Sequence, residues 1–226
     1  GGAVAGAAAG ALGGVALRLA PGSQATGGII VALAFIGALI GGLGAAGVGA
    51  GLAAAETLAR SRRGLALVAL GAAGGGAIGM LAHLLGGLML EGVFGGYDLS
   101  AVGGGPEGLA LGAAAGLGYA LTTPRPGGGG MATPRGSERA LAAIAAGLCC
   151  AAAAVALTSL GRHLTAASLN LVARSFRGSQ VGLAPVARLL GEPELGPLTR
   201  SVLAAYEGFL FGCGVILGLT RRTPKS

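Results

Sequence analysis

Long apolar runs without a charge alternate with short polar segments along this chain of 226 residues. Residues 19–55 and 140–161 contain no charged side chain, and residues 64–90 contain only His83. Each run exceeds the ~18–20 apolar residues that a helix needs to cross a bilayer. The pattern therefore predicts an all-α integral membrane protein.

Turn and charge signals divide these runs into six expected spans. The breaks fall at Pro21-Gly22-Ser23, at the cluster Arg60, Arg62 and Arg63, at the loop 95–105 and at a flexible Gly/Pro linker, 123–137. The expected spans cover residues 1–20, 28–56, 65–92, 106–122, 139–160 and 198–220. We expect them to form three helical hairpins, in residues 1–63, 64–122 and 138–226.

The connection 161–197 inside the last hairpin does not resemble a plain loop. His163, Asn170, Arg174 and Arg177 follow one another at spacings of seven, four and three, which places them on one side of a helix. We expect an amphipathic helix here, lying along the membrane surface or continuing the fifth span. A second short amphipathic piece runs from Leu183 through Leu190.

The composition supports a membrane protein rather than a soluble or disordered one. The chain is 53% hydrophobic and only 10% charged, against roughly 25% charged for soluble domains. A disordered Gly/Ala-rich polymer is the alternative. The large aliphatic residues inside the runs argue against it, and no collagen-like glycine period occurs.

The net charge of +7 reflects topology better than nucleic-acid binding, because most basic residues lie between apolar spans. Nine of the fifteen lie after the second span, after the fourth span or in the tail: Arg60, Arg62, Arg63, Arg125, Arg135, Arg139, Arg221, Arg222 and Lys225. We therefore expect the loops after the second and fourth spans and both termini to lie in the cytoplasm. The expected location is the cell membrane, as a multi-pass protein of the bacterial inner membrane.

Glycines recur every four residues in several spans, and this spacing aligns them along one side of a helix. Such a stripe lets another backbone approach closely, which matters in lipid, where no hydrophobic effect drives helices together. The alternative is that a GC-rich genome enriches glycine for reasons unrelated to packing. The predicted packing positions are Gly2, Gly6, Gly10, Gly14, Gly71, Gly75, Gly79, Gly108, Gly112, Gly116, Gly208 and Gly212.

The fourth and sixth spans share a pattern at an offset of one hundred residues. Glu107-Gly108, Gly112, Leu117-Gly118 and Thr123-Pro124 match Glu207-Gly208, Gly212, Leu217-Gly218 and Thr223-Pro224. We interpret this as a parallel internal repeat whose unit is a two-helix hairpin. Chance similarity among glycine-rich helices is the alternative.

Few ionisable residues lie within the expected spans, and they are the candidates for chemistry. Glu207 lies well inside the sixth span, where an ionisable group often serves a proton, ion or ligand. His83, Glu91 and Glu107 could line a polar path with it, and Arg18 or Arg162 could neutralise a carboxylate. The alternative is that all of them only fix helix packing.

Several chemistries lack the residues that they require. The two histidines are far apart in sequence, and Cys149, Cys150 and Cys213 form no zinc pattern. The glycine runs lack a Gly-Lys-Ser/Thr ending, and no serine has a recognisable nucleophile context. We expect no metal, no cofactor and no enzymatic activity.

Gly44, Gly47, Gly49 and Gly51, followed by Glu56, Ala59 and Arg60, resemble the first helix of the proteolipid rotor subunit of rotary ATPases. The resemblance covers about twenty residues. It implies a second helix with a central ion-carrying carboxylate. The next span here has His83 and only a distal Glu91, so no functional residue is carried over.

These observations favour a polytopic membrane domain that assembles through its glycine stripes and acts as an anchor or coupling element. Its expected partners are the lipid bilayer, further copies of itself or another membrane protein, and no nucleic acid. The first residue is Gly1 rather than Met, which favours a processed chain or part of a longer protein. The alternative function is a small-solute, ion or proton transporter or channel that uses Glu207.

Overall fold

The computed structural model describes residues 1–19, 26–58, 62–94, 104–124, 132, 134–162 and 184–221, and for 86–94 and 184–185 the backbone alone. Within these ranges the chain forms helices and no strand, so the all-α prediction is confirmed. The helices are α1 Gly2–Leu19, α2 Gly28–Leu58, α3 Arg63–Phe94, α4 Gly105–Thr122, α5 Gly136–Ser159, α7 Ala184–Leu189 and α8 Pro197–Leu219.

Five of the described helices are long and apolar enough to cross a membrane: α1, α2, the Arg63–Leu85 part of α3, α5 and α8. They are consistent with a multi-pass membrane protein. The expected fourth span forms α4, which is not among the five. Its 18 residues include Pro106, Glu107 and five glycines, which lower its hydropathy.

Large apolar side chains on the outside of the bundle fit a lipid environment. Val31 and Leu121, for example, are 72% and 71% exposed. Water would make extensive apolar exposure of this kind unfavourable, whereas lipid would not. With 31 residues, α2 is about 46 Å long, so part of it extends beyond a hydrocarbon core of about 30 Å.

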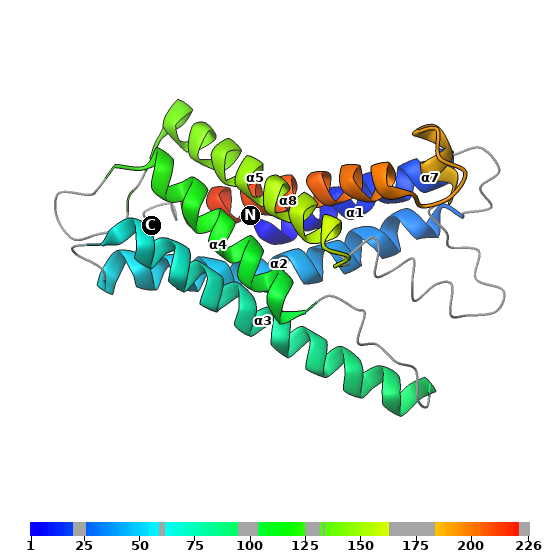
Figure 1. Cartoon of the computed structure of the whole chain (residues 1–226), viewed down its shortest axis with the longest axis horizontal. Coiled ribbons are helices and arrows are strands. Elements are labelled where there is room, and N and C mark those ends of the chain that lie inside the picture. The colour runs from blue at the N-terminus through cyan, green and yellow to red at the C-terminus, as the bar shows by residue number, and fades with distance from the viewer. Residues whose placement is uncertain are drawn as a thin grey trace, which may run out of the picture.

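Among the described helices, the six long ones lie alongside one another (Figure 1), and their contacts form a closed ring. Each contacts the next in the order α1, α2, α3, α4, α5 and α8, and α8 returns to contact α1. Three of them, α2, α4 and α8, also contact one another inside the ring. The second helix of each expected hairpin is therefore on the inside.

The core lies where these inner helices meet. Val48 and Leu52 of α2, Tyr119 of α4 and Ile216 of α8 are fully buried and belong to one hydrophobic cluster. Leu67 of α3 joins the same cluster. The cluster connects the inner helices to the outer ones.

The segment between α5 and α8 is described only in part. Helix α7 lies inside the short amphipathic piece that was expected from Leu183 through Leu190. The expected amphipathic helix that carries His163, Asn170, Arg174 and Arg177 lies outside the described residues. Most of the expected linker 123–137 also lies outside them.

Candidate functional site

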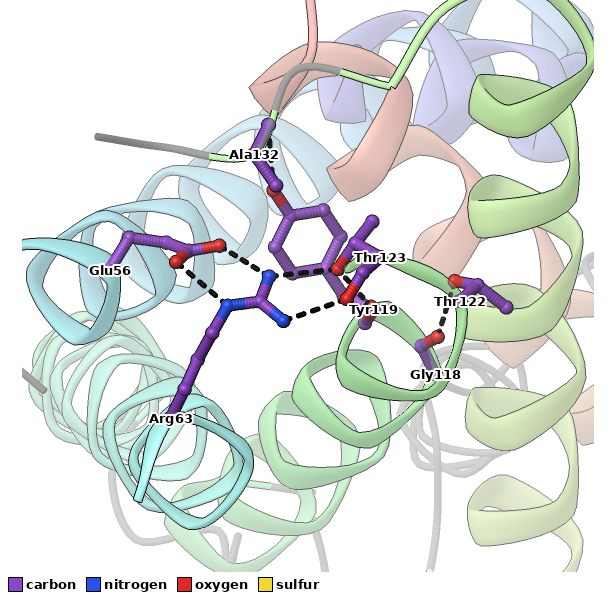
Figure 2. Close-up of polar contacts among 7 residues, drawn as sticks. All are labelled: Glu56, Arg63, Gly118, Tyr119, Thr122, Thr123 and Ala132. Carbon is purple, nitrogen blue, oxygen red and sulfur yellow. Dashed lines mark hydrogen bonds and ion pairs between the residues drawn. The ribbon is translucent and has the colours of Figure 1, made fainter. Parts of the chain in front are cut away.

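A buried polar cluster joins α2, α3 and α4 at the end of the bundle where α2 and α4 end and α3 begins (Figure 2). The Arg63 guanidinium donates to both carboxylate oxygens of Glu56, from Nε at 2.9 Å and from Nη2 at 2.6 Å. The side chains of Glu56 and Arg63 are only 1% and 7% exposed. This is a bidentate ion pair that is shielded from solvent.

Arg63 also binds the last turn of α4. Its Nη1 donates to the carbonyl oxygen of Thr123 and its Nη2 to the Thr123 hydroxyl, both at 2.8 Å. The same hydroxyl donates to the carbonyl oxygen of Tyr119 at 2.5 Å. Carbonyl groups at a helix C-terminus lack intrahelical partners and carry partial negative charge. The cation therefore stabilises the end of α4.

Tyr119 completes the cluster. Its ring is fully buried, and the Arg63 guanidinium carbon lies 5.6 Å from the ring centroid, within cation–π range. Its hydroxyl donates to the carbonyl oxygen of Ala132 at 3.0 Å. The residue thus connects the linker after α4 to the core.

The hydrogen-bonding groups of this cluster are extensively engaged. All three guanidinium nitrogens of Arg63 donate, and both carboxylate oxygens of Glu56 accept. Exchange of an ion or proton here would leave a buried charge without its partner, which is strongly unfavourable. The arrangement suits a fixed connection between three helix ends.

A second polar cluster lies at the opposite end, where α4 begins. Oε2 of Glu107 accepts the backbone N–H of Gly104 at 2.6 Å, and Oε1 accepts Nε of Arg162 at 2.6 Å. The first contact is half of a capping box, and the second joins α4 to the end of α5. The Glu107 carboxylate raises the pKa of Arg162 above its ordinary value.

His83 lies next to this second cluster. A Cβ placed on Gly104 would be 2.9 Å from Cβ and 3.3 Å from Nδ1 of His83. Two of the predicted polar residues, His83 and Glu107, therefore both lie next to Gly104. Glu91 lies further along α3, and its side chain is outside the described part of the chain.

Glu207 lies in α8 and is half-buried. Spacings of seven and four residues place Glu207 on the same side of α8 as Gly214 and Gly218. Those two glycines lie against α1, at Ala5 and Gly1. In the adjacent residue Tyr206 the hydroxyl is buried and has no hydrogen-bond partner among the described residues.

The glycines predicted for packing lie where backbones approach closely. A Cβ on Gly6 would overlap the carbonyl oxygen of Gly37 in α2, and Cβ atoms on Gly75 and Gly108 would each overlap the other's carbonyl oxygen. Gly2, Gly10 and Gly14 also lie against α2, Gly71 and Gly79 against α4, Gly112 and Gly116 against α3, and Gly208 and Gly212 against α5. Their energetic importance stays a prediction.

The Glu56–Arg63 pair was not identified from sequence. Arg63 was grouped with Arg60 and Arg62 as a loop charge that reports topology, whereas it begins α3 and is buried. The available signal was Glu56, an acid that directly follows the uncharged run 19–55.

The comparisons with family models, with curated proteins and with solved structures find no match to this chain.

Proposed function

We propose that this chain is a non-enzymatic membrane domain of six spans in three hairpins, which anchors or couples a partner at its cytoplasmic side. In this proposal α4 also crosses the membrane, in addition to the five candidate helices. Although less apolar than the others, it packs between α3 and α5 and is therefore partly shielded from lipid. The bilayer is the first partner, and a further copy or another membrane protein is the second.

The observation that carries this proposal is that each buried charge in the described part of the bundle has an oppositely charged partner. Glu56 pairs with Arg63, and Glu107 pairs with Arg162. Both pairs join helices that come from different expected hairpins: α2 with α3, and α4 with the end of α5. A carrier needs a charge that can lose and regain its ligand, whereas a scaffold needs charges that hold helices together.

The interior of the ring also favours a scaffold over a channel. Val48, Ala115 and Val215 come from the three inner helices, are buried and belong to one hydrophobic cluster. Such packing stabilises helix contacts and does not favour the passage of a hydrated ion.

The basic end of the bundle fits a cytoplasmic side. Arg62, Arg135, Arg139 and Arg221 lie where α2, α4 and α8 end and where α3 and α5 begin. Basic residues next to spans are enriched on the cytoplasmic side of membranes. We place the coupling partner on this side.

A transporter is the second candidate function. Its support is the position of Glu207 inside a candidate span, beside the buried Tyr206 hydroxyl. Ionisable residues at such depth often belong to a transport path. In that case Glu207 would take up and release the transported proton or ion.

Flux through liposomes separates the two functions. Purified protein would be reconstituted with a pH-sensitive dye inside and an imposed potassium diffusion potential, and ion-sensitive dyes would extend the assay. If the chain is a scaffold, liposomes that contain the wild type or Glu207→Gln should leak no faster than liposomes without protein. A transporter predicts flux that Glu207→Gln abolishes and that the exposed control Glu138→Gln retains.

Reporter fusions test the proposed side of attachment. A fluorescent protein fused after Ser226 should fluoresce and stay with the membrane fraction, while alkaline phosphatase fused at the same point should be inactive. The reverse result would place the basic end outside and contradict attachment of a cytoplasmic partner there.

A further inference from the structure

Three arginines meet where α5 begins and α8 ends, on the same side of the bundle (Figure 1). Nε of Arg139 donates to the Thr220 hydroxyl at 2.9 Å, and its Nη2 donates to the carbonyl oxygen of Leu217 at 2.7 Å. Arg221 directly follows Thr220, and Arg135 is the residue just before α5. We refer to Arg135, Arg139 and Arg221 together as the α5–α8 arginine surface.

Two of these arginines are available to a partner. Arg135 and Arg221 are exposed, and neither side chain has a hydrogen-bond or ion-pair partner among the described residues. The single acid that the structure describes at this junction is Glu138, which is also exposed. Positive charge therefore exceeds negative charge here.

The opposite ends of α5 and α8 do not have this excess. The described charges there and in α7 are Arg162, Arg188 and Arg200 with Glu107, Glu192 and Glu194. Glu107 binds Arg162, and Glu192 accepts the backbone N–H of Thr199 at the start of α8. The excess of arginine is thus confined to one end of this helix pair.

The arginine surface lies at the expected depth of lipid headgroups. The two candidate membrane spans are Gly136–Ser159 and Pro197–Leu219. Arg135 directly precedes the first span, and Arg221 lies two residues after the second. A long basic side chain at the end of a span extends toward the polar headgroup region.

Exposed apolar side chains lie beside these arginines. Leu141, two residues after Arg139, is 57% exposed, and Leu217, four residues before Arg221, is 39% exposed. Both lie within the candidate spans, closer to the middle of the membrane than the ends where Arg135 and Arg221 lie. Cations next to exposed leucines suit a molecule that has an anionic head and hydrocarbon chains. An acidic protein segment in water would contact the arginines alone.

We propose that the α5–α8 arginine surface binds the headgroup of an anionic phospholipid from the surrounding bilayer. This inference rests on the proposed function as a membrane domain and names the class of lipid that it prefers. Guanidinium groups donate paired hydrogen bonds to phosphate oxygens. A zwitterionic lipid carries its own cation, so the excess of arginine favours a lipid with net negative charge.

Native mass spectrometry of the detergent-solubilised full chain tests this preference. Phosphatidylglycerol and phosphatidylcholine with the same acyl chains would compete, and the ratio of the two in the first bound lipid would be measured. We expect the wild type to prefer phosphatidylglycerol. Removal of the exposed pair in Arg135→Gln/Arg221→Gln should lower the ratio about fivefold for each arginine, the effect expected of a basic residue beside an anionic surface.

Arg188→Gln/Arg200→Gln is the matched control, because it removes two exposed arginines from the opposite end. It should leave the ratio unchanged. An equal loss in both double variants, or no loss in Arg135→Gln/Arg221→Gln, overturns the proposal. If that double variant does not fold, the single variants Arg135→Gln and Arg221→Gln decide: a lower ratio in each supports the proposal, and an unchanged ratio in both overturns it.

Poly-glutamate distinguishes a lipid from an acidic protein partner. If the wild type binds the two lipids equally but binds poly-glutamate, and Arg135→Gln/Arg221→Gln does not, the surface receives an acidic protein segment and the proposal is overturned. Flux in liposomes and the reporter fusions test the proposed function separately. Lipid preference in detergent depends on neither result, so either proposal can fail alone.

Discussion

The Glu56 carboxylate, two residues before the end of α2, accepts two hydrogen bonds from Arg63, the first residue of α3. The same guanidinium holds the carbonyl oxygen and the hydroxyl of Thr123, just beyond α4. One arginine thus connects the ends of three consecutive helices. The stability of this end of the bundle should depend on it.

Removal of one partner of this pair should destabilise the protein strongly. Arg63→Ala leaves the Glu56 carboxylate buried without its cation, which costs about 3–5 kcal/mol. We expect a large fall in the thermal midpoint in detergent, measured with the thiol-reactive dye. The double variant Glu56→Leu/Arg63→Met should recover part of the loss, because no buried charge remains.

Arg62→Ala is the matched control, because Arg62 is adjacent in sequence but exposed. It should change the midpoint little, since exposed charges contribute about 0–1 kcal/mol. Equal midpoints for Arg62→Ala and Arg63→Ala would show that the buried pair does not stabilise the protein.

Two glycines of α1 test whether close backbone contact matters. A Cβ on Gly6 would overlap the carbonyl oxygen of Gly37, whereas a Cβ on Gly13 would meet nothing within 4 Å. Gly6→Ala should force α1 and α2 apart at a cost of about 1–3 kcal/mol. Gly13→Ala should be neutral or slightly stabilising. If both variants unfold at the same temperature, glycine enrichment would reflect genome composition.

Glu192 makes the start of α8 sensitive to acid. Its carboxylate accepts the backbone N–H groups of Leu198 and Thr199 at 3.1 and 2.9 Å and the Thr199 hydroxyl at 2.6 Å. The Thr199 hydroxyl, followed by its backbone N–H, lowers the pKa of Glu192. The stabilisation is therefore full above the ordinary pKa of a glutamate, about 4.3, and is lost as the pH falls through the lower folded-state pKa.

Comparison of the wild type with Glu192→Gln checks this dependence. Thermal midpoints between pH 7 and pH 3 should differ most at neutral pH and should converge under acid conditions. A constant difference across the range would mean that the carboxylate charge makes no contribution. Thr199→Val, which removes the hydroxyl donor, should reduce the difference between neutral and acid pH.

Arg139 should hold the end of α8 against α5. Its Nη2 donates to the carbonyl oxygen of Leu217 at 2.7 Å, and its Nε donates to the Thr220 hydroxyl at 2.9 Å. Arg139→Ala should therefore increase hydrogen exchange of amides around Thr220 with little change in the global midpoint. Exposed Arg221 offers the control. Equal exchange in Arg139→Ala and Arg221→Ala would contradict this role.

Apolar runs predicted the helices well because a span must satisfy its backbone internally whatever it packs against. The boundaries of α2, α5 and α8 lie within a few residues of the expected spans. The glycines at four-residue spacing in α1, α3 and α4 lie close to another helix, and their role in stabilising the packing stays a prediction. These features depend on local periodicity, which a sequence displays directly.

The polar clusters could be predicted only in part: Glu107 and Arg162 were candidates, but which carboxylate Arg162 would meet depends on tertiary structure. Arg162 and Glu107 are 55 residues apart in sequence. Arg63 lies seven residues after Glu56 but in another helix. Because Arg60 and Arg62 are close to it in sequence, it was interpreted as a loop charge.

Alkaline carbonate extraction of cells that express the chain tests the central claim most directly, namely that the apolar helices lie in lipid. The account predicts that the protein remains in the membrane pellet, dissolves only in detergent and is strongly helical by circular dichroism. Recovery in the aqueous supernatant as a monomer without helical signal would contradict it.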